Sequence, residues 1–166
     1  IVHRVGHADV DALQHLFERC VDHFVLHDGE PPGSDTAAIE LGDVPPGRSV
    51  ADKYVHGVFD PDDPGRLIAV LESVAGYPDA STWFLGLLLI DPAHRGGGLG
   101  ATMLSGFESM ATGLAFTQVR LAVIRPNSAG RRFWERHGFV LEATREQRPF
   151  GLLVHDVDVL VHRLGS

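Results

Sequence analysis

The chain of 166 residues is 44% hydrophobic and 22% charged, and it carries a formal net charge of −8. This length and composition predict a single soluble domain over residues 1–166 with a hydrophobic core of its own. The negative charge argues against nonspecific nucleic-acid binding, and the lack of an apolar run of about 18 residues argues against a membrane span.

The N-terminal segment predicts a short strand and one helix. Residues 1–5 are β-prone, and Asp9 or Asp11 can cap the helix that follows. Apolar residues then recur at steps of three and four up to Val25, which gives the helix one apolar face. Cys20 lies on this face, so we expect a buried structural thiol. Because it is the only cysteine, no internal disulfide can form, which fits a cytoplasmic protein.

A long loop and three strands are expected next. Residues 28–50 are rich in Pro, Gly and Asp, which predicts a loop with at most one short helical turn. Residues 54–59 and 67–74 are β-like and are separated by turn-forming residues, so we expect them to pair as antiparallel strands. Residues 83–90 are almost continuously apolar, which predicts a central strand covered on both faces.

The second half of the chain alternates helices and strands. We expect a helix from the glycines at 96–100 to Gly113, a strand at 119–124, a helix from Asn127 or Ser128 to His137, and strands at 139–143 and 153–161. In the last strand Asp156, Asp158 and His162 alternate with apolar residues, so we expect one face to be exposed to water. The element order predicts a mixed α/β (α+β) fold around one sheet.

The turn after residues 83–90 carries the functional signal. Four of the five residues at 96–100 are glycines, which allow positive φ and let a ligand approach the backbone. The first N–H groups of the following helix lack intrahelical partners and suit a pyrophosphate, at about 1.5–3 kcal/mol for each charged hydrogen bond. Arg95 adds a planar cation that can contact either a phosphate or the loop itself.

Three other interpretations of this turn are weaker. A purely structural tight turn would not need so many glycines, because each costs conformational entropy. Gly96-x-Gly98-x-x-Ala101 formally matches a dinucleotide fingerprint, but the next strand is followed by Arg125 instead of the acid that binds a ribose. A P-loop is excluded because no Gly-Lys-Ser/Thr follows the glycines.

Two segments together resemble one known family. Arg95-Gly96-Gly97-Gly98-Leu99-Gly100 resembles the R/Q-x-x-G-x-G/A signature of the GNAT superfamily of acetyl-CoA-dependent N-acetyltransferases. Asn127, followed by Phe133-Trp134-Glu135-Arg136-His137-Gly138-Phe139, resembles the second motif of that family. The resemblance implies a GNAT-like single domain, in which helices flank a mixed, mostly antiparallel central sheet with one splayed strand pair.

The resemblance also implies a binding mode for acetyl-CoA. The strand at 83–90 would splay from the strand at 119–124, and the pantetheine arm would bond to the main chain of Leu88, Leu89 and Ile90. The acetyl carbonyl would be polarised by a backbone N–H near Leu89 or Ile90. The pyrophosphate would lie on residues 95–100, which comprise Arg95, Gly96, Gly97, Gly98, Leu99 and Gly100. Asn127 would contact the pantetheine end, although a helix-cap role fits it equally well.

The implied reaction is direct attack of an amine on the thioester, helped by a general base and a general acid. Many relatives place a Tyr acid where Trp134 stands, so we expect Trp134 to pack against the cofactor arm or the core. No Glu occurs at 83–90, which leaves Glu72 as the candidate base, because its apolar surroundings would raise its pKa. A solvent-facing Glu72 is the alternative.

The departures from the family pattern motivate a second hypothesis, a noncatalytic acyl-CoA-binding sensor on the same fold. For an enzyme, the expected acceptor is a primary amine of a small molecule or peptide. The ten histidines are scattered and Cys20 has no partner thiol, so we expect no metal. We expect no nucleic-acid or membrane partner, and the oligomeric state, a homodimer included, stays open.

Overall fold

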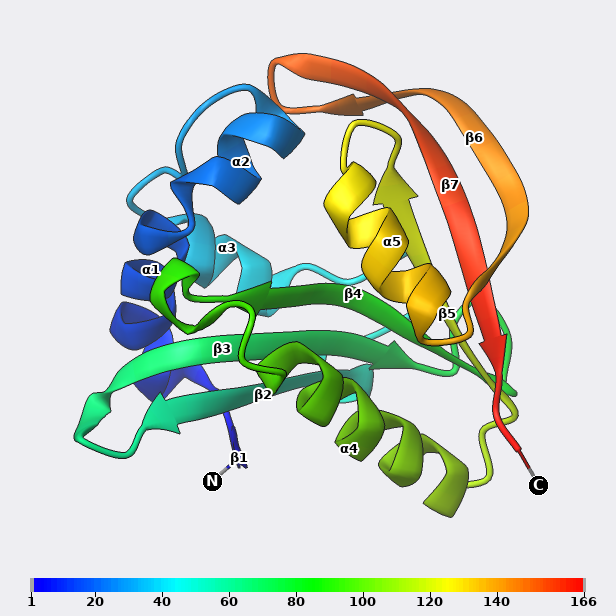
Figure 1. The fold of residues 1–166 in the computed structure, drawn as a ribbon, viewed down its shortest axis with the longest axis horizontal. Helices are drawn as coiled ribbons and strands as arrows, with labels where there is room; N and C mark the ends of the chain where they lie inside the picture. The colour runs from blue at the N-terminus through cyan, green and yellow to red at the C-terminus, as the bar shows by residue number, and fades with distance from the viewer. Residues whose placement is uncertain (1, 166) are drawn as a thin grey trace.

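The computed structural model describes residues 2–165, and the strands in this part of the chain form one seven-stranded sheet (Figure 1). Its order is β1-β2-β3-β4-β5-β7-β6, and every neighbouring pair is antiparallel except β4 and β5, which are parallel. The strands are β1 (Val2–Arg4), β2 (Lys53–Asp60), β3 (Asp63–Ala75), β4 (Thr82–Ile90), β5 (Gln118–Ile124), β6 (Val140–Phe150) and β7 (Leu153–Arg163). The mixed, mostly antiparallel sheet confirms the predicted fold class.

The helices cover both faces of this sheet. They are α1 (Val10–Arg19), α2 (Val21–Asp28), α3 (Thr36–Gly42), α4 (Leu99–Gly113) and α5 (Ser128–Arg136), with short 3₁₀ turns at His7–Asp9, Val50–Asp52 and Pro92–His94. One core lies between the sheet and α1 to α3, and the other lies between the sheet and α4 and α5. The central strand β4 serves both cores, because Trp83 and Leu85 belong to the second and Leu89 to the first.

The N-terminal helix differs from the prediction. The apolar stripe predicts one helix up to Val25, but the chain leaves helical geometry at Cys20, where φ is −95° and ψ is 36°, and then resumes as α2. The break redirects the second helix, so that Val25 is exposed while Phe24 is buried. Cys20 itself is fully buried between the two helices and the sheet, as a structural thiol requires.

The predicted loop at 28–50 contains a helix of seven residues, α3. Ala37 and Leu41 lie four residues apart on one side of this helix and are buried against α1. Periodicity could not reveal so short a helix, because only two apolar positions mark it. The predicted water-exposed face of the last strand is also wrong at Asp158, which is buried among Arg125, Arg131 and Thr144.

Candidate functional site

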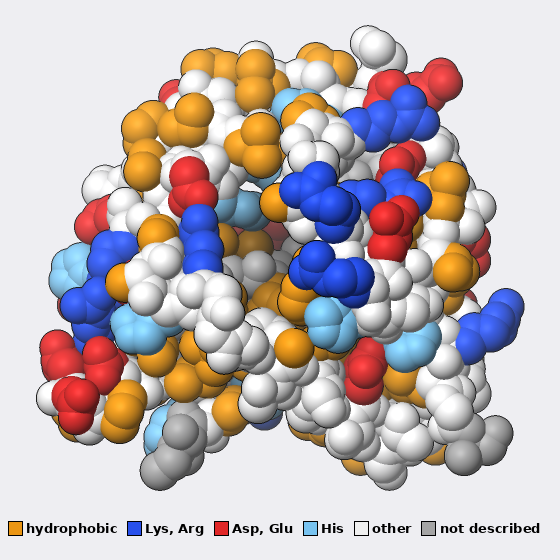
Figure 2. All heavy atoms as spheres, in the orientation of Figure 1, with side chains coloured by type: hydrophobic (Ala, Val, Ile, Leu, Met, Phe, Trp, Pro, Cys, Tyr) orange, Lys and Arg blue, Asp and Glu red, His pale blue; other side chains and the backbone are white. Residues whose placement is uncertain are grey.

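The only parallel strand pair of the described sheet separates partway along its length. β4 and β5 pair from Thr82 to Leu85 and from Gln118 to Leu121, and the remaining residues of both strands are unpaired with each other. A cavity of about 210 Å³ opens in this gap, lined by both strands, by α2 and by α5. Figure 2 shows the hollow between two groups of cationic side chains, in the view of Figure 1 where α2 and α5 stand on either side.

The main chain of β4 presents alternate groups to this gap. The Asp91 N–H donates to the Ile68 carbonyl at 2.8 Å, so the antiparallel alternation directs the polar groups of Leu89 toward β3 and those of Leu88 and Ile90 toward the gap. Leu88 and Ile90 accordingly line the cavity, and Leu89 does not. A bulge leaves Gly86 without a partner on β3, at the inner end of the opening.

The glycine turn forms an open cradle at the start of α4. Gly96 and Gly98 adopt φ of 81° and 84°, and Gly98 is the N-cap of the helix. A Cβ placed on Gly96, Gly97 or Gly98 would meet no atom within 4 Å, and the N–H groups of these three residues donate no hydrogen bond to another of the described residues. A cavity of about 340 Å³ adjoins the cradle; its lining includes Leu99, Gly100, Arg136 and His137. Backbone donors at a helix N-terminus favour an anionic ligand.

Arg95 is held back from the cradle. Its guanidinium contacts both carboxylate oxygens of Asp22 on α2, at 2.5 and 3.1 Å, and its Nε donates to the Ile90 carbonyl at 2.9 Å. The sequence predicts a contact with a phosphate or with the loop itself; in the structure the partners are Asp22 on α2 and the carbonyl of Ile90 at the end of β4. The sequence predicts that the main chain of Ile90 contacts the pantetheine arm. Its carbonyl already accepts the hydrogen bond from Arg95, so only its N–H remains available toward the gap.

Helix α5 supplies two predicted residues to the wall of the gap. The Asn127 side chain accepts a hydrogen bond from the Gly130 N–H at 2.9 Å and caps the helix, while it also lines the cavity. A Cβ on Gly130 would lie 2.6 Å from the Asn127 Nδ2, so a larger residue here would displace the capping side chain from its present position. Trp134 is buried, lines the same cavity and packs with ring centroids 4.8 Å from Phe133 and 5.5 Å from Phe139.

Glu72 is buried beneath the bulge, so the alternative of a solvent-facing side chain is wrong. Its Oε1 lies 3.3 Å from the position that a Cβ on Gly86 would take and 3.0 Å from the Nζ of Lys53, which is also buried. Burial raises the pKa of Glu72 to about 9, and the negative charge of Glu40 contributes to this rise, against the opposing effect of Lys53. The site therefore disfavours the charged form of this carboxyl.

Two histidines near the gap were missed by sequence reasoning. His23 and His27 lie four residues apart on α2, line the cavity and stack with ring centroids 5.3 Å apart. Burial lowers the pKa of His23 to about 4, so its ring is neutral at pH 7. The spacing of four on a helix was the available signal, but only the strand gap turns this face toward a cavity.

The hairpin between β6 and β7 reaches across to α2. Leu152 N–H donates to the Asp28 carbonyl at 2.8 Å, and the His155 Nε2 lies 2.8 Å from the His27 carbonyl oxygen. Figure 1 shows this hairpin arching over the gap to the end of α2. These hydrogen bonds connect the β6–β7 side of the strand gap to α2, which lies on the other side of the gap.

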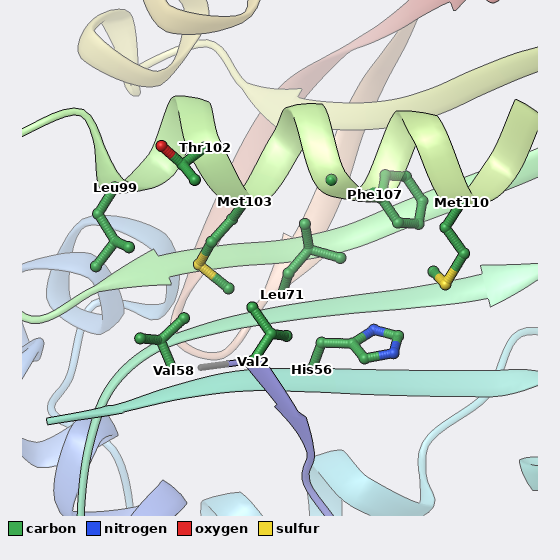
Figure 3. Close-up of a pocket in the computed structure, with 10 residues that line it drawn as sticks. Val2, His56, Val58, Leu71, Leu99, Thr102, Met103, Phe107 and Met110 are labelled. Atoms are coloured by element: carbon green, nitrogen blue, oxygen red, sulfur yellow. The ribbon is translucent and has the colours of Figure 1, made fainter. Parts of the chain in front are cut away.

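A larger cavity of about 360 Å³ lies between α4 and the β2–β3 side of the sheet (Figure 3). Its lining is apolar except for Thr102 and His56, and burial lowers the pKa of His56. It offers no cluster of groups that could bind an anion or move a proton, so we place the candidate site at the strand gap. No helix of residues 2–165 is long and apolar enough to cross a membrane.

Comparisons with known proteins agree with this geometry. The model of the acetyltransferase (GNAT) family matches residues 26–139. An acetyltransferase from Thermus thermophilus aligns with a TM-score of 0.79 and 22% identity, over 99% of this chain and 96% of its own. No curated protein sequence matches the chain.

Two further solved structures share the fold at lower identity. The ribosomal-protein-S18-alanine N-acetyltransferase from Escherichia coli aligns with a TM-score of 0.74 and 16% identity, over 100% of this chain and 94% of its own. The spermidine N-acetyltransferase from Vibrio cholerae, solved with CoA and spermine, aligns with a TM-score of 0.73 and 17% identity, over 99% and 95%.

Proposed function

The chain belongs to the acetyltransferase (GNAT) family, and on this premise we propose that it transfers the acetyl group of acetyl-CoA to a primary amine of a small molecule or peptide. The observation that carries the proposal is that the cavity in the β4–β5 gap and the cavity at the glycine cradle of α4 adjoin, because both are lined by Ile90, Gly100 and Phe133. The cradle would bind the pyrophosphate, and the gap would admit the pantetheine arm. Residues 1–166 would act as one catalytic domain.

The proposed contacts follow from the free main-chain groups. Gly96, Gly97 and Gly98, with the N–H groups of Leu99 and Gly100, would face the pyrophosphate. Leu88 would offer both of its main-chain groups to the pantetheine arm, and Ile90 its N–H. Asn127 and Trp134 would form the opposite wall. Arg95 would act by shaping the loop through Asp22 and Ile90.

The proposed reaction is direct attack of the amine nitrogen on the thioester carbonyl carbon, after which the carbon–sulfur bond breaks and CoA leaves as a thiolate. The nitrogen of the adduct loses its extra proton, and the thiolate takes up one proton through water, so the products are the amide and the CoA thiol. The ammonium form of the amine cannot attack, because its lone pair is protonated. Glu72 would accept that proton as general base, across the Gly86 bulge. Trp134 has no acidic proton to give the thiolate, so the proposal assigns it a packing role.

The test is the release of free CoA thiol from acetyl-CoA in the presence of a panel of amines. We expect Glu72→Gln to lower kcat by about 10²-fold or more, the usual contribution of a general base, with little effect on acetyl-CoA binding measured by calorimetry. Wild-type turnover in this variant across the pH range would remove Glu72 from the role.

A noncatalytic acyl-CoA sensor is the second candidate. Two observations favour it, namely Trp134 in place of a proton donor and the raised pKa of Glu72, which disfavours the carboxylate that a general base needs. Calorimetric binding of CoA without thiol release for any amine would support the sensor and contradict the enzyme.

A further inference from the structure

His27 on α2 carries an imidazole that none of the contacts proposed above uses. Its side chain is 30% exposed and lines the cavity in the β4–β5 gap, together with Leu88, Ile90 and Asn127. The ring therefore borders the space that the pantetheine arm would enter. Of the described residues that line this cavity, His23 is the only other titratable one, and its pKa of about 4 makes it too weak a base near neutral pH.

Asp28 sets the orientation of this imidazole. The His27 Nδ1 lies 3.4 Å from the Asp28 Oδ1, whereas the Nε2 has no hydrogen-bond partner among residues 2–165. A carboxylate beside one ring nitrogen favours the tautomer with the N–H on that nitrogen, which leaves the lone pair on the other. The main chain here is anchored, because the His27 carbonyl lies 2.8 Å from the His155 Nε2 and the Asp28 carbonyl accepts the Leu152 N–H at 2.8 Å.

The surroundings of His27 keep its ring neutral at pH 7. Burial lowers the pKa of His27 below its usual value of 6.5. His155 on β7 acts in the same direction, whereas the carboxylates of Asp28 on α2 and Glu40 on α3 act against it. His23, one helical turn earlier on α2, stacks on the ring with centroids 5.3 Å apart and is itself neutral. A neutral imidazole with a lone pair at Nε2 can accept a proton.

The proposed reaction leaves one proton without a named acceptor, namely the extra proton on the nitrogen of the adduct. We propose that His27 is the catalytic residue that accepts this proton, with Asp28 as the positioning residue that orients its ring. The inference rests on the proposed function and deepens it, because this proton arises only after an amine has attacked acetyl-CoA. Glu72 keeps the earlier step, in which the free amine forms.

The proton steps balance without an added reactant. The N–H bond of the adduct breaks, its electron pair stays on nitrogen, and the lone pair of the His27 Nε2 takes the proton. The adduct then no longer reverts to reactants, because a nitrogen anion would have to leave, so the carbon–sulfur bond breaks instead. The imidazolium releases its proton to water, and water protonates the thiolate. The net change is one proton moved from nitrogen to sulfur.

The test compares His27→Gln with His15→Gln, which makes the same substitution at an exposed position of α1. His27 holds the hairpin through its main-chain carbonyl, which the substitution keeps, so we expect both variants to fold and to bind CoA in calorimetry as the wild type does. We expect His27→Gln to lower kcat by about 10²-fold or more, the usual contribution of a general base, and His15→Gln to leave kcat unchanged.

The pH profile separates a catalytic role from a structural one. An imidazolium cannot accept the proton, so below the pKa of His27 the wild-type kcat should fall more steeply with falling pH than that of His27→Gln. Asp28 raises the pKa of His27, so Asp28→Asn should move this acid limb to lower pH. Added imidazole should restore part of the rate of amide formation to His27→Ala, above the enzyme-free rate, because it can occupy the place of the missing ring.

The role of His27 is overturned if His27→Gln turns over like His15→Gln, or if it loses rate while the acid limb stays and imidazole restores nothing to His27→Ala. Should the His27 variants not fold, Asp28→Asn decides, and an unmoved acid limb in that variant overturns the role. A wild-type chain that releases no thiol with any amine overturns the proposed function itself, whereas an active wild type with an equally active His27→Gln overturns only this inference.

Discussion

Gly98 has to meet two requirements at once in the glycine cradle. Its φ of 84° begins α4 in the left-handed region, and its missing side chain leaves the neighbouring amides open. A side chain in the left-handed region costs about 1–2 kcal/mol. In the proposed enzyme, a Cβ at this position would also stand where the pyrophosphate approaches.

We therefore expect Gly98→Ala to lower stability by about 1–2 kcal/mol and to weaken CoA binding by about tenfold or more, the loss of one charged hydrogen bond. Gly106→Ala is the matched control within α4, because a Cβ there also meets no atom within 4 Å but its φ is not positive. It should bind CoA as the wild type does. Calorimetry with CoA and thermal unfolding measure both; equal CoA affinity in the two variants would contradict the cradle.

The residues of the glycine cradle could be predicted from the sequence, whereas the residues around Arg95 and Glu72 could not. Glycines at 96–100 are next to one another, so their joint effect on the backbone can be predicted locally. The contact of Arg95 with Asp22 joins residues that lie 73 positions apart, and no local pattern contains it. Lys53 was missed for the same reason, because a lone lysine at the start of a strand gives no sign of burial.

At the scale of elements, Lys53 holds α3 against β2. The ammonium donates to two main-chain carbonyls at the C-terminal end of α3: that of Glu40, which also accepts from the Asp43 N–H at 3.2 Å, and that of the C-cap residue Asp43. Its Nζ also lies 3.0 Å from Oε1 of the buried Glu72 carboxyl. Removing one partner of such a buried pair leaves the other partner uncompensated.

We expect Lys53→Met to destabilise the fold by about 3–5 kcal/mol, the usual loss when one partner of a buried pair is removed. Chemical denaturation monitored by tryptophan fluorescence measures the change. Arg4→Met is the control, because among residues 2–165 its guanidinium donates to the Lys53 carbonyl and lies over the face of the Tyr54 ring, without contact to a carboxylate. A loss below about 1 kcal/mol for Lys53→Met, the range of exposed ion pairs, would show that the cluster does not hold α3.

At the scale of the whole molecule, two buried groups with shifted pKa values should shape the dependence of stability on pH. Burial lowers the pKa of His23 from 6.5 to about 4, so its contribution is complete above pH 6.5 and is lost as pH falls toward 4. Burial raises the pKa of Glu72 from 4.5 to about 9, so its contribution is complete below pH 4.5 and is lost as pH rises through 9.

The two contributions change in opposite directions between pH 4.5 and 6.5, so we expect the unfolding temperature to be nearly constant there and to fall below about pH 4.5 and above about pH 6.5. His23→Gln should turn this plateau into a decline with rising pH, and Glu72→Gln should turn it into a rise and remove the fall above pH 6.5. Calorimetric scans of the wild type and both variants provide the measurement. Parallel curves for all three proteins would assign the pH dependence to other groups.

The sequence by itself determined the order of the main strands and helices, the glycine turn and the family motifs. These features depend on periodicity and turn chemistry among residues that are close in the chain, so each can be recognised from its own segment. The N-terminal helices were harder to predict. The break at Cys20 between α1 and α2 does not interrupt the apolar pattern, and α3 has only two buried apolar residues, so its periodic signal is weak.

Only the tertiary structure decided where β4 and β5 part, that Glu72 shares its buried site with Lys53 and Glu40, and that Arg95 turns away from the cradle toward Asp22. Each of these depends on segments that are distant in the chain and meet only when the sheet and helices pack. The burial that shifts the pKa of Glu72 likewise exists only in the folded chain, because an extended chain leaves every carboxyl in water.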